Sequence, residues 1–120
     1  MPVLSNGAKF VTHATALDST ADTDVYVVPT NFSSHVEHLL IGNNNSSNKD
    51  YTLKYYEADT ATTHTLFSSH AVTGKGSESI FTVDKPLYIH EGDKLIVAAE
   101  TADTLTVVVA AEEFYEPNRT

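Results

Sequence analysis

The sequence predicts an all-β fold, and three observations lead to this prediction. Apolar and polar residues alternate in short runs rich in Thr, Val and Tyr, which is the pattern of half-buried strands. Turn-forming residues separate these runs. Good helix formers are nowhere spaced at the helical period of about 3.6 residues. We therefore expect one domain over residues 1–120, an antiparallel β-sandwich of about eight strands with a jelly-roll-like arrangement.

Each expected strand is bounded by residues that interrupt a β-ladder. Pro29 ends the second run because proline has no N–H to donate. Gly42 and the asparagines after it end the third run, and Pro86 divides or kinks the segment after the sixth. In order, the runs are AKFVTHATA (8–16), DVYVVP (24–29), HVEHLLIGN (35–43), YTLKYYEA (51–58), a run over about 62–72, ESIFTV (78–83), PLYI (86–89), DKLIVAAE (93–100) and TLTVVVAAEEFY (104–115).

Alternation also assigns side chains to faces, because side-chain direction reverses at each residue of a strand. Leu105, Val107 and Val109 form the clearest row. Val108 on the opposite face suggests a central strand that is covered on both sides. We expect two facing sheets to bury such rows. The other core candidates are the pairs Leu39 and Ile41, Leu53 and Tyr55, Leu87 and Ile89, and Leu95 and Val97.

The two ends and the longest polar loop lack the pattern of core elements. Residues 1–8 are expected to form an extended N-terminal arm, and residues from about 114 to 120 a C-terminal tail. We expect one or both to reach a neighbouring subunit. The loop NNNSSNKD (43–50) carries no apolar anchor, so it should be exposed and mobile. The start, MPVLSNGAKF, has neither the basic leader nor the apolar run of a signal peptide.

Charge and cysteine content argue against several functional classes. The chain has 16 acidic and 7 basic residues and a net charge of −9, so binding to a phosphate backbone is not expected. It has no cysteine, which excludes disulfides, thiolate metal sites and thiol nucleophiles. The longest apolar runs, VVVAA and LIVAA, are too short to span a bilayer. We therefore expect no nucleic-acid and no membrane partner.

The stretch PLYIHEGDKLIV (86–97) holds three polar residues that could form a metal or acid/base site: His90, Glu91 and Asp93. The stretch also has the residues of a tight hairpin, because Gly92 can adopt the positive φ that such a turn requires. Asp93 can accept hydrogen bonds from nearby backbone N–H groups, as aspartates in turns often do. We interpret the stretch as a structural turn.

The histidines show no metal-binding pattern within a strand, where a site needs two or more ligands on one face. His35 and His38 are three residues apart and are expected to point to opposite faces. His64 and His70 share a face but would lie about 20 Å apart along the strand. A site assembled from different strands stays open, but the sequence leads us to expect no metal and no cofactor.

Motifs for nucleophilic or phosphate chemistry are also missing. The sequence has no Gly-x-Ser-x-Gly elbow, and TGKGSES (73–79) lacks the spacing of a phosphate-binding loop. Glu112 and Glu113 are adjacent, so on a strand they face opposite ways and cannot act as a pair. We therefore expect the protein not to be an enzyme.

Five aromatic residues raise one alternative from a different functional class. They could form a stacking platform for a sugar, which would make the chain a carbohydrate-binding attachment module. Tryptophan, the strongest stacking residue, is absent. Packing in the core or between subunits is the favoured interpretation. The five residues are Tyr51, Tyr55, Tyr56, Phe114 and Tyr115.

The order of several motifs matches a known class of protein. VYVVPTNFSSHVEHLLIGN (25–43) precedes an Asn-rich loop, and YTLKYYEAD (51–59) follows that loop. DKPLYIHEGDKLIVAAE (84–100) and a valine-rich last strand then complete the order. Over roughly residues 25–113, this resembles small β-sandwich structural proteins of tailed bacteriophages, marine or cyanobacterial phages especially. These share a Val-Pro strand end, an L-x-I-x-N strand and a P-L-x-(I/L)-x-x-G-D-x-L hairpin. The chain departs from them at TGKGSES, where they have P-A-G-S.

The resemblance implies a virion component and no enzyme. The leading expectation is a homotrimeric capsid decoration (cement) subunit that stabilises the head through multivalent protein–protein contacts. The alternative is a tail, neck or head–tail ring adaptor subunit. Its partners would be copies of itself, the major capsid protein or other virion proteins, since symmetric packing can cover exposed sheet edges. The residues expected at such contacts are Met1, Pro2, Val3, Leu4, Phe114, Tyr115 and Pro117.

Overall fold

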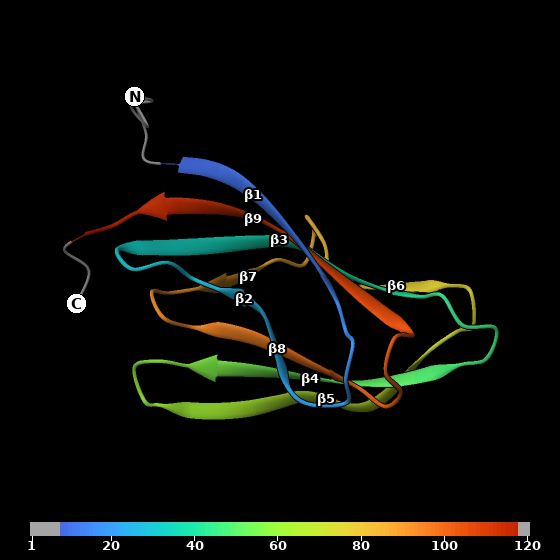
Figure 1. Cartoon of the computed structure of the whole chain (residues 1–120). Coiled ribbons are helices and arrows are strands. Elements are labelled where there is room, and N and C mark those ends of the chain that lie inside the picture. Colours follow the sequence, from blue (N-terminus) through green and yellow to red (C-terminus); the bar gives the residue numbers. More distant parts are fainter. Residues whose placement is uncertain (1–7, 118–120) are drawn as a thin grey trace.

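The computed structural model describes residues 8–117, which form two antiparallel β-sheets packed face to face (Figure 1). This described part contains nine strands. It includes no helix that is long and apolar enough to cross a membrane. The expected antiparallel sandwich is confirmed. The strands are β1 (Ala8–Ala16), β2 (Thr23–Val27), β3 (Phe32–Asn43), β4 (Lys49–Glu57), β5 (Thr62–Val72), β6 (Ser77–Phe81), β7 (Leu87–Ile89), β8 (Lys94–Ala99) and β9 (Leu105–Tyr115).

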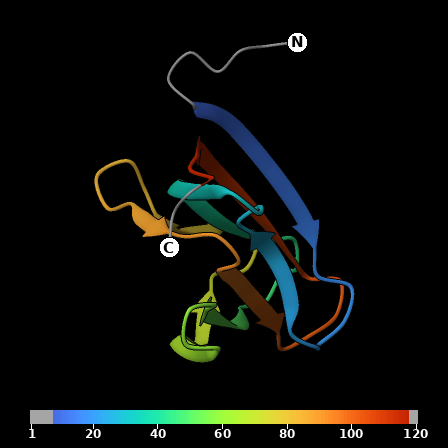
Figure 2. The ribbon, with the colours of Figure 1, turned by 90° about the vertical axis from the view of Figure 1, so that its left-hand side faces the viewer.

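The two sheets have the topology of a jelly roll. Sheet A has the order β1-β9-β3-β6, and β7 also pairs with β3. Sheet B has the order β2-β8-β4-β5. The chain passes from one sheet to the other at most of its connections, so that strands distant in sequence become neighbours, as in paired Greek keys. Figure 2 shows the two layers from the side, with β1 at the outer edge of sheet A.

The core forms where the inner faces of the two sheets meet. On β9 the odd-numbered residues from Leu105 to Glu113 are buried, and the even-numbered residues lie on the outer face. β8 shows the same alternation, with Leu95 and Val97 inside. The predicted core rows are confirmed, although Tyr55 and Leu87 are only half-buried. The largest fully buried side chains are Tyr51, Leu17, Leu39, Ile41, Leu53, Ile89, Leu95, Leu105, Val28, Val36, Val72 and Val97.

Two sequence-based expectations about strand surroundings are corrected by the structure. β9 is an inner strand of sheet A, between β1 and β3, but sheet B covers only one of its faces. Val108 therefore lies half-buried on the outer face, and the expectation of cover on both sides is wrong for the described chain. β7 and β8 belong to different sheets, so the turn between them is a corner that joins the sheets and not a hairpin.

The loop after β3 is held by hydrogen bonds, contrary to the expectation that all of residues 43–50 are exposed. Asn43 ends β3 and is buried, with its Nδ2 donating to the carbonyl oxygens of Ser47 and Val72 at 3.0 Å each. Gly74 packs so closely against the loop that a Cβ there would lie 2.3 Å from the Ser46 carbonyl oxygen. The loop is thus joined to the turn that follows β5. The sequence could not show this, because the partners are distant along the chain.

Leu39 provides a direct test of the buried core, because its side chain has 0% exposure. Leu39→Ala should lower the free energy of unfolding by about 2–5 kcal/mol, through lost burial and the cavity left behind. The matched change Leu66→Ala removes a side chain that is 42% exposed and should cost less than about 1 kcal/mol. Urea unfolding followed by circular dichroism measures both. Equal losses for the two variants would contradict the assigned faces.

Candidate interaction surface

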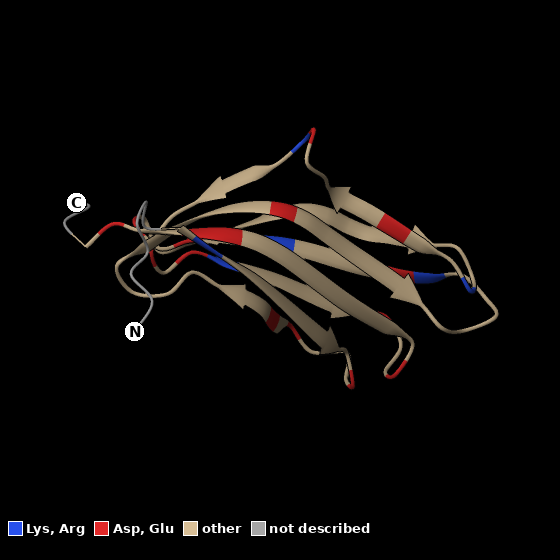
Figure 3. Cartoon of the chain, turned by 90° about the horizontal axis from the view of Figure 1, so that it is seen from above, with Lys and Arg blue, Asp and Glu red and all other residues tan. Residues whose placement is uncertain are grey.

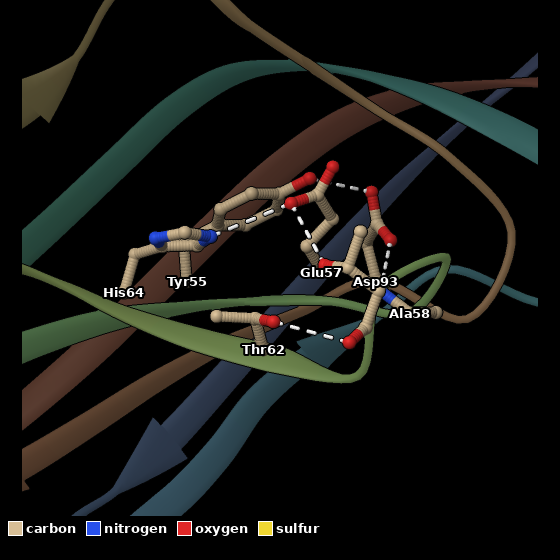
Figure 4. Close-up of polar contacts among 7 residues, drawn as sticks. Tyr55, Glu57, Ala58, Thr62, His64 and Asp93 are labelled. Atoms are coloured by element: carbon tan, nitrogen blue, oxygen red, sulfur yellow. Dashed lines mark hydrogen bonds and ion pairs between the residues drawn. The ribbon is translucent and has the colours of Figure 1, made fainter.

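The corner before β8 is built around the buried carboxylate of Asp93, which is 3% exposed. The carboxylate accepts hydrogen bonds from the backbone N–H of His90 at 2.9 Å and of Ala58 at 2.9 Å. The Tyr55 hydroxyl donates a third bond at 2.7 Å, and Figure 4 shows the bonds from Tyr55 and Ala58 to Asp93. Gly92 has φ of 83°, the left-handed conformation predicted for this position. The structural interpretation of Asp93 is therefore confirmed.

The other two polar residues of that stretch do not complete a site with Asp93. His90 contributes its backbone N–H, and its side chain is exposed. Glu91 is half-buried beside the turn. Asp93 already accepts three hydrogen bonds, which offset the cost of burying its charge. The arrangement fixes the corner and leaves no pair of groups poised for acid/base chemistry there.

A second buried carboxylate connects the two sheets. Glu113 of β9 is 2% exposed, and its Oε2 accepts a hydrogen bond from the Tyr26 hydroxyl of β2 at 2.5 Å. The same hydroxyl lies 2.9 Å from the Ser34 Oγ of β3. Lys9 Nζ lies 3.8 Å from the other carboxylate oxygen and supplies a compensating charge. The buried Glu113 faces away from Glu112, which confirms that the two adjacent glutamates cannot act as a pair.

A third tyrosine and carboxylate meet at the opposite end of the sandwich. Tyr51 of β4 is 1% exposed, and its hydroxyl donates to Glu78 Oε1 of β6 at 3.0 Å. His70 Nε2 of β5 lies 2.8 Å from the other oxygen of Glu78. The Tyr51 ring also packs edge-on against Phe67 and His70. These contacts join sheet B to β6 of sheet A. His70 thus has a structural role, in which it contacts Glu78 and the Tyr51 ring.

The sequence analysis placed His35 and His38 on opposite faces, and the structure corrects this. β3 has a register shift between Val36 and His38, so that Glu37 is an extra residue against β9. His35 lies opposite Glu112, and His38 lies opposite Ala110. Both partners are even-numbered residues of the outer face, so both histidines lie on that face too. A bulge adds one residue and thereby reverses the expected alternation.

This bulge brings together a set of groups that could hold a cation. One donor atom from each of His35, Glu37 and Glu112 lies within 4.8 Å of the others. An imidazole with two carboxylates suits a divalent transition metal. The groups are half-buried on an open sheet face, and His35 Nδ1 lies 3.8 Å from Glu37 Oε2 in an ordinary ion-pair arrangement. The sequence alone does not reveal this set, because Glu112 comes from another strand.

The aromatic residues weighed as a sugar platform are separated in the structure. Tyr51 is buried in the core, and Tyr55 is half-buried with its hydroxyl on Asp93. Tyr56 points to the opposite side of β4 and lies beneath Lys94 Nζ, which is 5.4 Å from the ring centre. Phe114 and Tyr115 belong to β9 in the other sheet. The five rings therefore form no continuous row for stacking a glycan.

The residues expected at partner contacts fall into two groups. Met1, Pro2, Val3 and Leu4 lie outside the described residues. Phe114 is half-buried on the outer face, whereas Tyr115 and Pro117 are exposed. Phe114 and Tyr115 are the last residues of β9, so the sheet extends two residues into the segment expected to be a tail. Tyr115 packs edge-on against Phe32, with ring centres 5.5 Å apart, which keeps the strand paired with β3 to its end.

The outer face of sheet A is the most uniform uncovered surface of the described chain. Figure 3 shows the chain from above, with Asp and Glu spread over loops and over parts of the strands. The residues in the central rows of this outer face are uncharged and either small or apolar. Alternation in the sequence places them on one face of each strand, and the pairing register brings the strands' rows side by side. We call these rows the middle of the outer face, because Glu112, His35 and His38 lie on the same face toward one end. The middle comprises Phe10, Thr12, Ala14 and Ala16 of β1, Thr106, Val108 and Ala110 of β9, and Leu40 and Gly42 of β3.

A groove runs along the side of the sandwich between the edge strands β1 and β2. It has a volume of about 500 Å³ and is lined by residues 12–15 and 24–27. His13 and Tyr26 face each other across it, with ring centres 5.7 Å apart. Few contacts join β1 to β2, because each belongs to a different sheet. The groove is therefore the open side of the sandwich.

Comparisons with known proteins support the fold. No protein-family model matches the chain, and no curated protein matches its sequence. In structure it is similar to a protein of Bacillus endospore appendages, which are disulfide-linked pili, with a TM-score of 0.51 and 11% identity over 97% of this chain and 96% of that chain. At this identity the similarity shows a shared β-sandwich fold.

Two virus particle proteins are similar at a lower level. The extra small virus of the giant freshwater prawn Macrobrachium rosenbergii has a protein with a TM-score of 0.49 and 13% identity, over 99% of this chain and 84% of that chain. A subviral particle of infectious bursal disease virus has one with a TM-score of 0.48 and 13% identity, over 92% of this chain. This chain spans 34% of the latter protein.

Replacing the corner carboxylate tests its structural role. Asp93→Asn removes the charge and one acceptor oxygen, so at least one donor in the corner loses its partner. The free energy of unfolding should fall by about 1.5–3 kcal/mol, which is typical for a buried hydrogen bond to a charged group. The matched change Asp84→Asn, at an exposed position, should be nearly neutral. Equal stability of Asp93→Asn and the wild type would contradict the structural role assigned to the Asp93 carboxylate.

Alkaline pH should destabilise the protein through three tyrosines. Burial first, and then the hydrogen bond to a carboxylate, raises the pKa of Tyr26, Tyr51 and Tyr55. In the unfolded chain these hydroxyls titrate near pH 10, so their stabilising contribution is complete below about pH 10 and is lost as pH rises above it. Urea unfolding between about pH 8 and 12 measures the decline. Tyr26→Phe should make it less steep, and stability constant across this range would contradict the arrangement.

Proposed function

We propose that this chain is a structural subunit of a bacteriophage virion, a capsid decoration (cement) protein that acts as a homotrimer. It would stabilise the head through repeated contacts with the major capsid protein. The observation that carries the proposal is the uncharged middle of the outer face of sheet A, in a protein whose net charge is −9. Glu112, His35 and His38 lie toward one end of that face. This face is uncovered in the described chain and has the composition of a contact surface.

The outer face fits a broad protein surface better than a small molecule. Small side chains such as Ala14, Ala110 and Thr106 keep the middle of the sheet nearly flat. Phe10 of β1, at 74% exposure, and Tyr88 of β7, at 66%, stand out from the face. Charged residues are depleted at the centres of protein interfaces because their desolvation is costly. A contiguous uncharged face of this kind often marks a binding site. Repeated copies would add many such contacts around a shell.

The fold and the sequence resemblance support the same role. The motif order resembles small β-sandwich proteins of phage particles, and the endospore appendage protein of similar fold forms pili. The pili are disulfide-linked. This chain has no cysteine, so its contacts would be non-covalent. The buried carboxylates of Asp93 and Glu113 and the half-buried carboxylate of Glu78 each accept a hydrogen bond from a tyrosine, which favours an architectural over a catalytic role.

Labelling purified virions with an antibody against the chain tests this proposal. A decoration protein gives label over the whole head, with a copy number comparable to that of the major capsid protein. Label confined to the neck or tail, with a small fixed copy number, would replace the proposal with a ring or tail adaptor subunit. Absence of the chain from purified virions would overturn a virion role altogether.

A substitution on the outer face tests the contact itself. Val108→Lys places a charge in the middle of the outer face, where its desolvation would oppose binding. Attachment to particles depleted of the chain should weaken by at least about tenfold. The control Val83→Lys makes the same change at a position that is 61% exposed on the connection between β6 and β7. Both variants should keep the wild-type urea midpoint, and undiminished attachment of Val108→Lys would exclude the outer face.

A further inference from the structure

We propose that the outer edge of β1, which pairs with no strand of residues 8–117, is a dimerisation surface on which a second copy of this chain adds its own β1 in antiparallel orientation. The two copies of sheet A would then join into one continuous sheet across a two-fold axis. The inference rests on the proposed function in one respect, namely that the chain works as an assembly subunit. It deepens that function by naming the contact strand, the partner and the register.

β1 is a long edge strand without features that prevent pairing. Its nine residues, Ala8–Ala16, pair with β9 in unbroken register. The strand contains no proline, no glycine and no residue with positive φ. Lys9, next to one end, is its only Lys, Arg, Asp or Glu. Natural proteins protect edge strands with prolines, charges, bulges or short length, and an unprotected edge is a template for another strand.

The other sheet edges in residues 8–117 do carry such protection. β2 has five residues, a register shift between Asp24 and Tyr26, and Pro29 soon after its end. β5 is long, but it has two register shifts against β4, and Ser69 has φ of 51°. The remaining edge is divided between β6 and β7, of five and three residues. The contrast singles out β1 for pairing with another chain.

The two-fold register follows from the length of the strand. Overlap of residues 9–15 of two antiparallel copies centres the axis on Thr12, the middle residue of β1. On the outer face Thr12 then lies beside the second Thr12, and Phe10 lies beside Ala14. Cross-strand Thr–Thr pairs are favourable. Lys9 would lie opposite Thr15, so the two Lys9 ammonium groups stay about 20 Å apart along the strands.

This register also covers the most exposed large apolar side chain among the described residues. Phe10 is 74% exposed on the outer face of β1. Beside the small Ala14 of the partner, the Phe10 ring would lie over the joined strands and lose much of its contact with water. Because the contact is isologous, it occurs twice in the dimer, once for the Phe10 ring of each copy. The apolar area removed from water would favour association.

The groove beside β1 leaves room for the inward side chains of an added strand. Residues 12–15 of β1 form one wall of this groove of about 500 Å³. In the proposed register Val11 of the second copy lies opposite His13, on the groove side of the strand. No element of the described chain occupies that side beyond β2. The dimer would therefore extend both the ladder and the core.

The two-fold contact is compatible with the trimer of the proposed function. A trimer or ring uses heterologous contacts between different surfaces, whereas β1 pairs with itself. Two-fold and three-fold axes combine in dihedral symmetry, so one assembly can contain both contacts. The remaining outer face stays available for the capsid.

Charge substitutions at the axis test the proposal with the whole chain. Thr12 is exposed, so Thr12→Lys and Thr12→Asp should fold, but each would oppose two like charges across the axis. Sedimentation equilibrium should show pairwise association for the wild type, as a dimer or, where the trimer also forms in solution, as a pair of trimers. The dissociation constant of the pairwise contact should be at least about tenfold higher for each variant. The control Thr63→Lys makes the same charge change on the exposed edge strand β5 and should dimerise like the wild type.

Mixing the two variants tests the register. Thr12→Lys and Thr12→Asp place opposite charges across the proposed axis, so the equimolar mixture should dimerise at least as tightly as the wild type. Amide hydrogen exchange should show protection of β1, and not of β5, that increases with protein concentration. A mixture that remains monomeric would overturn the Thr12 register.

Two results would overturn the β1 surface itself. One is a wild-type chain that stays monomeric at millimolar concentration, and the other is a Thr12→Lys variant that associates as tightly as the wild type. Neither result bears on the presence of the chain in virions. Conversely, a dimer that loses association on Thr12→Lys would stand even if antibody labelling found no chain in the particle.

Discussion

Val109 of β9 lies opposite Leu39 of β3, and both side chains are fully buried between the two sheets. The rest of the architecture depends on this contact between inner faces. β3 and β9 pair over nearly all of their length, and β1, β6 and β7 add to this central pair. Because strand side chains alternate, burying one face of sheet A necessarily leaves an equal number of residues on the other. The apolar Val108 and Leu40 lie on that second face.

Buried carboxylates and tyrosines join the layers at separate places. Tyr26 binds Glu113, Tyr51 binds Glu78, and Tyr55 binds Asp93. The first two pairs cross from sheet B to sheet A, and the third fixes the corner before β8. A buried polar group without a partner costs free energy, so these pairs also favour one arrangement of the sheets over others. These hydrogen bonds give Glu113, Glu78 and Asp93 a structural role, so no catalytic role is needed to explain them.

Two adjoining surfaces of sheet A take no part in these internal contacts and are available to other chains. The outer face of sheet A is uncharged over its middle rows, and the outer edge of β1 pairs with no strand of residues 8–117. They meet at Phe10, which belongs to both. A strand edge fixes the position and direction of a partner strand through backbone hydrogen bonds. A flat face selects a partner mainly by requiring a surface that is also uncharged and apolar. Together they give an assembly subunit a directional contact with its own kind and a broad contact with another protein.

Sequence alternation was sufficient to identify most strands and their inner rows. β1 and β5 were predicted with their observed boundaries, and the core positions of Leu39, Leu53, Leu95 and Val107 were correct. The turn role of Gly92 and Asp93 could also be predicted. These features depend on residues close together in the chain, where the period of two and the turn chemistry act.

Other features could not be derived from the sequence, because they depend on pairing between distant segments. The bulge at Glu37 exists only against β9, and it placed His35 and His38 on one face beside Glu112. The partner of Glu113 is eighty-seven residues away at Tyr26. Where a strand pairs without a bulge, the sequence by itself determined which side chains share a face, since that is a local property of an extended backbone. Only the tertiary structure decided which sheet each strand joined and which edge stayed open, since both result from long-range packing.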